Sequence, residues 1–197
     1  METYQVERGP VAKRNTAASR GLAVDLSSIE MPASIEDNTP QGALARQQIG
    51  ATLGSFREMF ASIGVQLGAR YDESPIIVAD EAPPADNYAR YVPSAVPGGR
   101  APHLWLAETR GLGDSLFDRF GVGFTLLNLA GKDHEASTIK AAAAAKKIPL
   151  KVLNIDQASA RDIYQRDFVL IRPDQHVAWR GNRLPDPAAT LSRLVGA

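Results

Sequence analysis

The residue types that most often carry out chemistry are sparse in this sequence. Its 197 residues include no cysteine and three histidines, His103, His134 and His176. A chain without cysteine has no disulfide, no thiolate metal site and no Cys-X-X-Cys redox motif. The histidines lack the i, i+4 spacing that places two imidazoles on one helix face to bind zinc. We therefore predict no catalytic residue and no metal ligand, and we interpret the histidines as surface or hydrogen-bonded side chains.

Two glycine-containing stretches raise the question of a phosphate-binding turn. "GLGDSLFDRFG" (111–121) contains Gly-X-Gly, but the third glycine of a dinucleotide-binding turn would fall at Leu116. In "PGGRAPHLWL" (97–106) both glycines precede a predicted strand, whereas a phosphate turn places them between a strand and a helix. We interpret the first stretch as a tight turn before a helix and the second as the entrance to a domain. We predict no cofactor-binding residue in either.

Composition and charge exclude several classes of partner. The 22 basic residues balance the 22 acidic ones, and the isoelectric point is about 6.8. A nucleic-acid-binding domain usually carries a basic excess. No apolar run approaches the length needed to span a bilayer, and the N-terminus lacks the apolar core of a signal peptide. We therefore predict no nucleic-acid partner, no membrane partner and a cytoplasmic location.

Charged residues cluster in the stretch that precedes residue 100. Their spacing fits no calcium-binding loop, so we predict a solvated acidic face formed by Asp72, Glu73, Asp80, Glu81 and Asp86. Arg100 is expected to form a salt bridge that ties the linker to the following domain.

The first half of the chain predicts helices followed by a linker. Residues 2–30 are expected to be helical, and Thr39 is the expected N-cap of a second helix that starts with Pro40. That helix is predicted to continue to residue 63 and to end near Gly64. Its steps of four and three place one apolar stripe along a single face, made of Ile49, Leu53, Phe56, Phe60 and Ile63. Residues 74–78 are a strand candidate, and the proline-rich residues after them are a linker.

From residue 103 the pattern alternates between strands and helices. It predicts an α/β fold with the order β-α-β-α-β-α-β-β-α, and Trp105 and Trp179 are expected to pack in its core. The predicted strands are 103–107, 123–130, 149–155, 168–172 and 176–180, and the predicted helices are 115–120, 134–148, 160–166 and 186–197.

Several of these stretches together resemble the C-terminal portion of the class A flavin-dependent aromatic-ring hydroxylases, such as the phenol and chlorophenol hydroxylases. The similarity is carried, in order along nearly the whole chain, by "YQVERGPVAKRN" (4–15), "RYDESPIIV" (70–78), "YVPSAVPGGRAPHLWL" (91–106), "SLFDRFGVGFTLL" (115–127) and "FVLIRPDQHVAWRG" (168–181). Two positions depart from the family, which commonly has Arg where Gly9 stands and often has Gly where Gln175 stands.

The resemblance implies a domain organisation. Residues 1–78 would correspond to the helices that close the flavin and substrate domains, and residues 79–97 would be a linker. Residues 98–197 would form a thioredoxin-like domain, with a central mixed sheet flanked by helices and no cysteine pair. FAD and NAD(P)H are implied for the full-length family, whereas the family's flavin-contacting motifs do not occur in this chain.

Two hypotheses about function follow. In the first, the chain is a structural C-terminal fragment of an aromatic hydroxylase whose partners are the missing N-terminal flavin and substrate domains. The orphaned helix would then pack on the second domain of its own chain or self-associate through residues 44–63. In the second, the chain is a stand-alone, redox-inactive thioredoxin-like module for binding or assembly. The aromatic substrate is not encoded in the residues that carry the resemblance.

Overall fold

The computed structural model describes residues 2–56 and 61–197. The chain divides into two compact units, which are treated separately below. We call them the sheet unit, formed by Met1–Gly9, Ala69–Ala85 and Val92–Ala197, and the helical unit, formed by Pro10–Gly68 and Asp86–Tyr91. No helix within the described ranges is long and apolar enough to cross a membrane.

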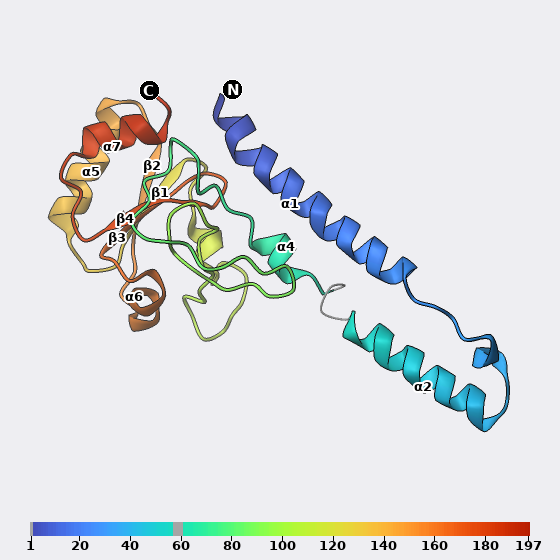
Figure 1. Ribbon diagram of the computed structural model, residues 1–197. Coiled ribbons are helices and arrows are strands. Elements are labelled where there is room, and N and C mark those ends of the chain that lie inside the picture. The colour runs from blue at the N-terminus through green and yellow to red at the C-terminus, as the bar shows by residue number, and fades with distance from the viewer. Residues whose placement is uncertain (1, 57–60) are drawn as a thin grey trace. The chain divides into compact units, whose positions relative to one another are not determined.

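The sheet unit contains a four-stranded mixed sheet with the order β2-β1-β3-β4 (Figure 1). Its strands are β1 (Phe124–Asn128), β2 (Leu150–Asn154), β3 (Phe168–Ile171) and β4 (Val177–Gly181). β1 and β2 are parallel, and the other two pairs are antiparallel. The helices are η2 (Leu116–Arg119), α5 (Asp133–Ala145), α6 (Ala158–Tyr164) and α7 (Pro187–Leu194). This mixed sheet between helices confirms the predicted thioredoxin-like α/β fold.

Both faces of the sheet are covered. Alternate residues of a strand point to opposite faces, and Leu127 and Val169 belong to the core cluster that also holds Ala160 and Tyr164 of α6. The other face meets α5, which packs beside α7. Because water reaches neither face, every residue of β1 and β3 is buried, as expected from their continuous apolar sequences.

Two predicted strands are absent from the sheet. Residues 103–107 form an irregular segment that contributes one isolated bridge, Trp105 to Ser115. Trp105 is 42% exposed, so its predicted core position is wrong, whereas Trp179 on β4 is buried as predicted. Residues 74–78 form turns, although the amide of Val78 still donates to the carbonyl of Ala178. Both segments are apolar because they cover the sheet, and short apolar runs of this kind look like strands in sequence.

The helical unit contains most of α1 (Glu2–Ser27), together with η1 (Ala33–Glu36), α2 (Pro40–Ser55) and α4 (Ile63–Leu67). Thr39 caps α2 as predicted, because its side chain accepts a hydrogen bond from the amide of Gly42. Arg46 donates to the carbonyls of Ile35 and Asp37 and so ties α2 to η1. These contacts fix the start of α2 and leave its later turns without such ties.

The predicted helix of residues 40–63 is wrong at its C-terminal end. α2 ends at Ser55, and Gly64 lies inside α4 instead of terminating a helix. Gly50 and Gly54 each lower the helix propensity of α2 by about 1 kcal/mol relative to alanine, and the Ser55 hydroxyl donates to the carbonyl of Thr52. The predicted apolar stripe therefore does not lie on one helix. Phe60, one of its members, lies outside the described residues.

The five acidic residues predicted to be solvated are exposed, and four of their carboxylates also pair with arginines. Within the sheet unit, Asp72 pairs with Arg70. Asp80 accepts from Nε of Arg180 at 2.9 Å, and Glu81 accepts from the same guanidinium. Asp86 belongs to the helical unit and pairs with Arg14. Residues 79–85, predicted as a linker, are held to the sheet unit by these charges.

Removing the charge of Asp80 is expected to destabilise the sheet unit. The Arg180 side chain is 1% exposed and the Asp80 side chain 20% exposed, so Asp80→Asn leaves a buried guanidinium short of one counter-charge. A fully buried pair broken in this way costs about 3–5 kcal/mol, and we expect on the order of 2 kcal/mol here because Glu81 and partial exposure compensate. Urea unfolding followed by circular dichroism measures the change. Glu73→Gln, at an exposed carboxylate of the same segment, is the control and should stay within about 0.5 kcal/mol of the parent. Equal stabilities of the two variants would contradict this account.

Candidate functional site

The most elaborate charged cluster of the sheet unit joins the start of α1 to the β3–β4 hairpin. The Glu7 carboxylate accepts two hydrogen bonds from Arg172, at 2.5 and 2.9 Å, and one from the Ser74 hydroxyl at 2.7 Å. Side-chain exposure is 7% for Glu7 and 12% for Arg172. Such a two-pronged pair fixes both position and orientation. The cluster therefore anchors the first turns of α1 to the sheet.

The protonation equilibria of this cluster follow from burial and pairing. Burial opposes ionisation of Glu7, but the hydrogen bonds from Arg172 and Ser74 outweigh it and lower the Glu7 pKa below its ordinary value. Burial likewise opposes ionisation of Asp174, and the nearby His176 and Arg172 reverse the effect and lower the Asp174 pKa. Burial raises the pKa of Tyr71. The two carboxyl groups are thus held in their charged forms.

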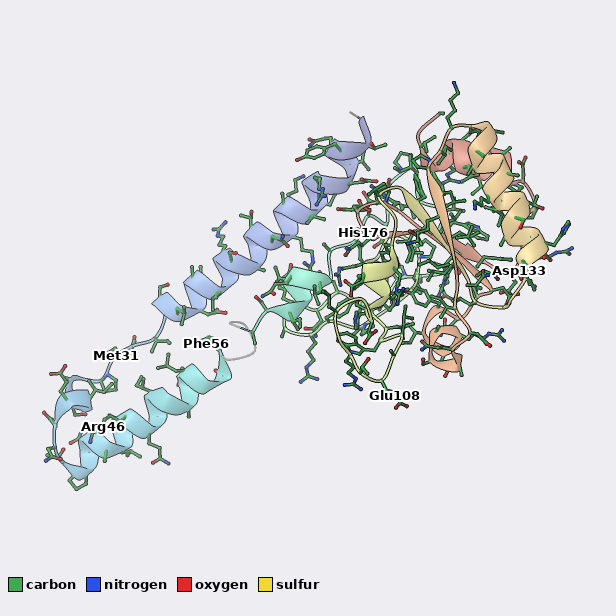
Figure 2. All side chains as sticks on the ribbon, turned by 180° about the vertical axis from the view of Figure 1, so that it is seen from behind. Met31, Arg46, Phe56, Glu108, Asp133 and His176 are labelled. Atoms are coloured by element: carbon green, nitrogen blue, oxygen red, sulfur yellow. The ribbon has the colours of Figure 1, made fainter. Side chains whose placement is uncertain are left out.

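His176, labelled in Figure 2, belongs to the same cluster through its contacts with Tyr71 and Asp174. Its ring stacks on that of Tyr71 with 4.2 Å between centroids, and its Nδ1 lies 3.0 Å from the Asp174 carbonyl oxygen. The turn that presents it has Gln175 at φ 68°, so the left-handed geometry is kept although the family often has glycine there. His176 is a hydrogen-bonded core histidine.

A second polar network lies where a redox-active thioredoxin fold would carry its cysteine pair, between β1 and the N-terminus of α5. The Asn128 side-chain amide donates to Asp133 and to Asn154 at 3.2 and 3.1 Å, and its oxygen accepts from the amide of Lys132. Lys132 also pairs with Asp167 at 2.6 Å. Amide and carboxylate hydrogen bonds hold this junction in place, and the segment offers no group that could carry electrons.

The Gly-X-Gly stretch forms a tight turn, as predicted. The Asp114 carboxylate accepts from the amide of Gly111 at 2.8 Å, and the Asp118 carboxylate accepts from the amide of Gly113 at 3.0 Å. The hydrogen bonds from Thr109 and Gly111 lower the Asp114 pKa. A phosphate would need these amides as donors, and here carboxylates of the chain itself already occupy them.

Arg100 and His103 occupy the domain entrance. Arg100 donates to the Gln175 side-chain oxygen at 3.1 Å, and its guanidinium lies 4.3 Å from the centre of the Phe117 ring. The expected pairing with a carboxylate is therefore replaced by an amide and a cation–π contact. His103 lies 3.1 Å from the Ser115 hydroxyl, which also accepts from the amide of Phe117 at the start of η2.

The structure brings together residues whose pairing the sequence did not predict. Glu7 and Arg172 are 165 positions apart, and Asp80 and Arg180 are 100 apart. The signal that could have revealed them is an arginine inside or beside an apolar strand, since such a charge needs a buried partner. Within residues 2–56 and 61–197, no three His, Asp or Glu side chains lie close enough to hold a metal ion. Together, the hydrogen bonds and ion pairs described above hold segments that are distant in the sequence at fixed positions in the sheet unit.

Comparison with known proteins identifies the family to which the chain belongs. A model described as "Aromatic-ring hydroxylase, C-terminal" matches residues 94–197, more than half of the chain. Among curated proteins, the chain is 26% identical to phenol 2-monooxygenase of Pseudomonas sp. (strain EST1001) over 97% of its own length. It is 30% identical to 2,4-dichlorophenol 6-monooxygenase of Cupriavidus pinatubonensis over its whole length. It covers 37% and 39% of those two proteins.

The fold comparison agrees. The rebeccamycin biosynthetic enzyme RebC with reduced flavin superposes on all of this chain, with a TM-score of 0.86 and 32% identity, and the match covers 36% of RebC. The flavin-dependent monooxygenase PieE, solved with FAD and substrate, gives a TM-score of 0.75 at 25% identity, with 38% of its chain covered. The chain belongs to the flavin-dependent aromatic-ring hydroxylase family and spans only the C-terminal part of its members.

Proposed function

We propose that this chain serves as the structural C-terminal part of an FAD- and NAD(P)H-dependent hydroxylase of phenolic rings, and that the flavin is held by another part of the enzyme. The observation that carries the proposal is the missing core of the helical unit. Among its described residues, 10–56, 61–68 and 86–91, only Gly42, Ala45 and Gly64 are buried. A unit of this size without apolar burial has little to offset its conformational entropy.

The apolar side chains of the helical unit point to what completes it. Five of them lie at the surface, with exposures of 46% or more, at Val24, Met31, Leu44, Leu53 and Ile63. Burial of apolar area contributes about 25 cal/mol per Å², so these side chains favour a protein partner. The relatives that carry the same C-terminal part are much longer than this chain. The flavin- and substrate-binding part of the hydroxylase is therefore the partner that we infer for this surface.

The charged anchors of the sheet unit fit a positioning role. Glu7 and Arg172 hold the start of α1, and Arg180 holds the segment at residues 80–81. In this proposal the sheet unit is a rigid base for α1, and the redox chemistry takes place elsewhere in the enzyme. Hydroxylation of an electron-rich ring by O₂ and reduced flavin is the activity implied for the assembled protein.

The alternative is a stand-alone, redox-inactive thioredoxin-like module for binding or assembly. It is supported by the sheet unit, which contains all the buried apolar side chains of the described residues except Ala45. The mass of the natural polypeptide in its host distinguishes the two. A product as long as the relatives supports the hydroxylase, whereas a natural product of this length supports the module.

The purified chain is expected to bind no FAD. Its Gly-X-Gly amides are occupied by Asp114 and Asp118, and a flavin dinucleotide site normally depends on such amides. After incubation with FAD and desalting, the visible absorption spectrum of the protein should show no flavin band. A stoichiometric yellow complex would refute the assignment of the flavin to another part of the enzyme.

The isolated chain is expected to self-associate through the α2 surface when the flavin-binding part is absent. Leu53 is 47% exposed and lies on the same side of α2 as Ile49, and the variant Leu53→Glu should shift the mass measured by light scattering toward the monomer. The variant Gln48→Glu adds the same charge at an exposed polar position on another side of α2 and should associate like the parent. A parent chain that is monomeric at every concentration would contradict this expectation.

The anchor of α1 is expected to weaken in acid. Because the Glu7 pKa is lowered in the folded chain, the pair with Arg172 adds stability that is present above the unfolded-state pKa of about 4.3. That stability is lost as the pH falls through the lower, folded-state value. Urea unfolding at a series of pH values should show a shallower acid loss for Glu7→Gln than for the parent. Ser74→Ala, which keeps the ion pair, should retain most of the parent's slope, and identical slopes for parent and Glu7→Gln would exclude Glu7 as a source of the acid sensitivity.

A further inference from the structure

The two edges of the four-stranded sheet differ in how they are covered. The order β2-β1-β3-β4 places β4 at one edge and β2 at the other. The chain itself covers β4, because the Val177 amide donates to the Gly99 carbonyl and the Val177 carbonyl accepts from the Gly98 amide. Within the described part of the chain, β2 pairs with β1 alone. Because an uncovered edge strand is a template for pairing with another strand, the outer side of β2 is a candidate interface.

The register of β2 on β1 identifies the backbone groups that point outward. The Pro149 carbonyl accepts from β1 just before β2 begins, and the Ile155 amide donates to β1 just after β2 ends. Between these two bonds, every second residue of β2 bonds to β1. The other residues turn their amides and carbonyls away from the sheet, and they are Leu150, Val152 and Asn154. No other described residue forms a hydrogen bond with these outward groups.

We propose that this edge pairs with the β2 edge of a second copy of the chain, so that the two sheets join across a two-fold axis. Antiparallel pairing centred on Val152 places this residue opposite its counterpart and places Leu150 opposite the partner's Asn154. All the outward amides and carbonyls of both strands are then paired, as in other cases of strand addition. Pairing centred on Lys151 would instead set two like charges opposite each other. The edge therefore selects one register for a second copy.

The lysine of this edge leaves the backbone of β2 accessible. Lysine on an edge strand often prevents pairing with another chain. Here the Lys151 side chain lies against Gly121, where an added Cβ would meet the Lys151 Cβ and Cδ at 3.2 and 3.5 Å. It is thus directed along one face of the sheet. Val152, at the centre of the register, is β-branched and half-buried, and β-branched residues stabilise cross-strand pairs.

α5 adds a charge match to the same arrangement. It runs antiparallel to β2, because Asp133 at the start of α5 accepts from the Asn154 side chain at the end of β2 (Figure 2). Lys140 is exposed and lies on the same side of α5 as Asp133, at the i, i+7 spacing. A two-fold axis through Val152 keeps both α5 helices on one face of the joined sheet, in opposite directions. Lys140 of each copy then faces the partner's Asp133, and this reciprocal match favours a second copy over an unrelated strand.

The test uses the full chain carrying Leu53→Glu, in which the α2 surface no longer contributes to association. Sedimentation equilibrium should show a reversible dimer of this variant. Adding Val152→Pro removes one outward amide, leaves the bonds to β1 intact and should weaken the dimer at least about tenfold, equivalent to 1.4 kcal/mol. Val152→Thr keeps the amide and should leave the dissociation constant within about twofold of its parent. A Leu53→Glu chain that is monomeric at every concentration, or a dimer that Val152→Pro does not weaken, would overturn the proposal. Neither result would affect the function proposed above, on which this inference does not rest.

Two further measurements do not depend on the folding of the proline variant. In the Leu53→Glu background, Lys140→Glu places a like charge opposite the partner's Asp133 and should weaken the dimer at least about threefold. Lys146→Glu makes the same change at the C-terminal end of α5 and should leave the dimer unchanged. Hydrogen exchange of the Val152 and Asn154 amides should slow as the chain concentration rises. Equal effects of the two lysine variants, or exchange that is independent of concentration, would contradict pairing through β2.

Discussion

The sheet unit depends on neutralising two buried arginines of the β3–β4 hairpin. Arg180 lies on β4 with its side chain 1% exposed, and Arg172 follows β3 with 12% exposed. A guanidinium in such surroundings is tolerated only if it is paired and fully hydrogen-bonded. Neither arginine has its main partner in the hairpin. Glu7 comes from α1, and Asp80 and Glu81 come from the segment that precedes the domain. The two charges therefore recruit distant segments of the chain to the sheet.

The residues that match the family model do not by themselves supply all the partners that these two arginines need. The family model begins at residue 94, yet Glu7, Asp80 and Glu81, the carboxylates from outside the hairpin that pair with Arg172 and Arg180, all precede that residue. In physical terms, the thioredoxin-like domain is complete only together with residues 69–85 and the first turns of α1, as the compact sheet unit indicates. The junction between β1 and α5 is held by hydrogen bonds instead of thiols. The side chains of Asn128, Asp133 and Asn154 bond to one another there, and they order the start of α5 at the position where a redox-active thioredoxin-like protein carries its cysteines.

The helical unit follows a different principle. Its order comes from polar contacts, with Arg14 joining α1 to α4 and Arg46 joining α2 to η1. Several of its larger apolar side chains, among them Met31 and Leu44, lie at the surface. Polar contacts specify geometry but add little net stability, so this unit gains most from apolar contact with something beyond itself. The surface for a protein partner that we propose on α2 is a consequence of that composition.

The amino-acid sequence by itself determined the family, the α/β class and the positions of most sheet elements. Apolar runs such as residues 123–130 identify strands that are buried on both faces, and the Thr39–Pro40 pair identifies the start of α2, because these signals are local. The end of α2, the irregular course of residues 103–107 and the partners of the acidic residues were decided only by the tertiary structure. A helix that is weakened by two glycines ends according to its surroundings, and a short apolar segment can cover a sheet without joining it. A carboxylate finds its arginine across a hundred residues or more, and no pattern within a local window carries that information.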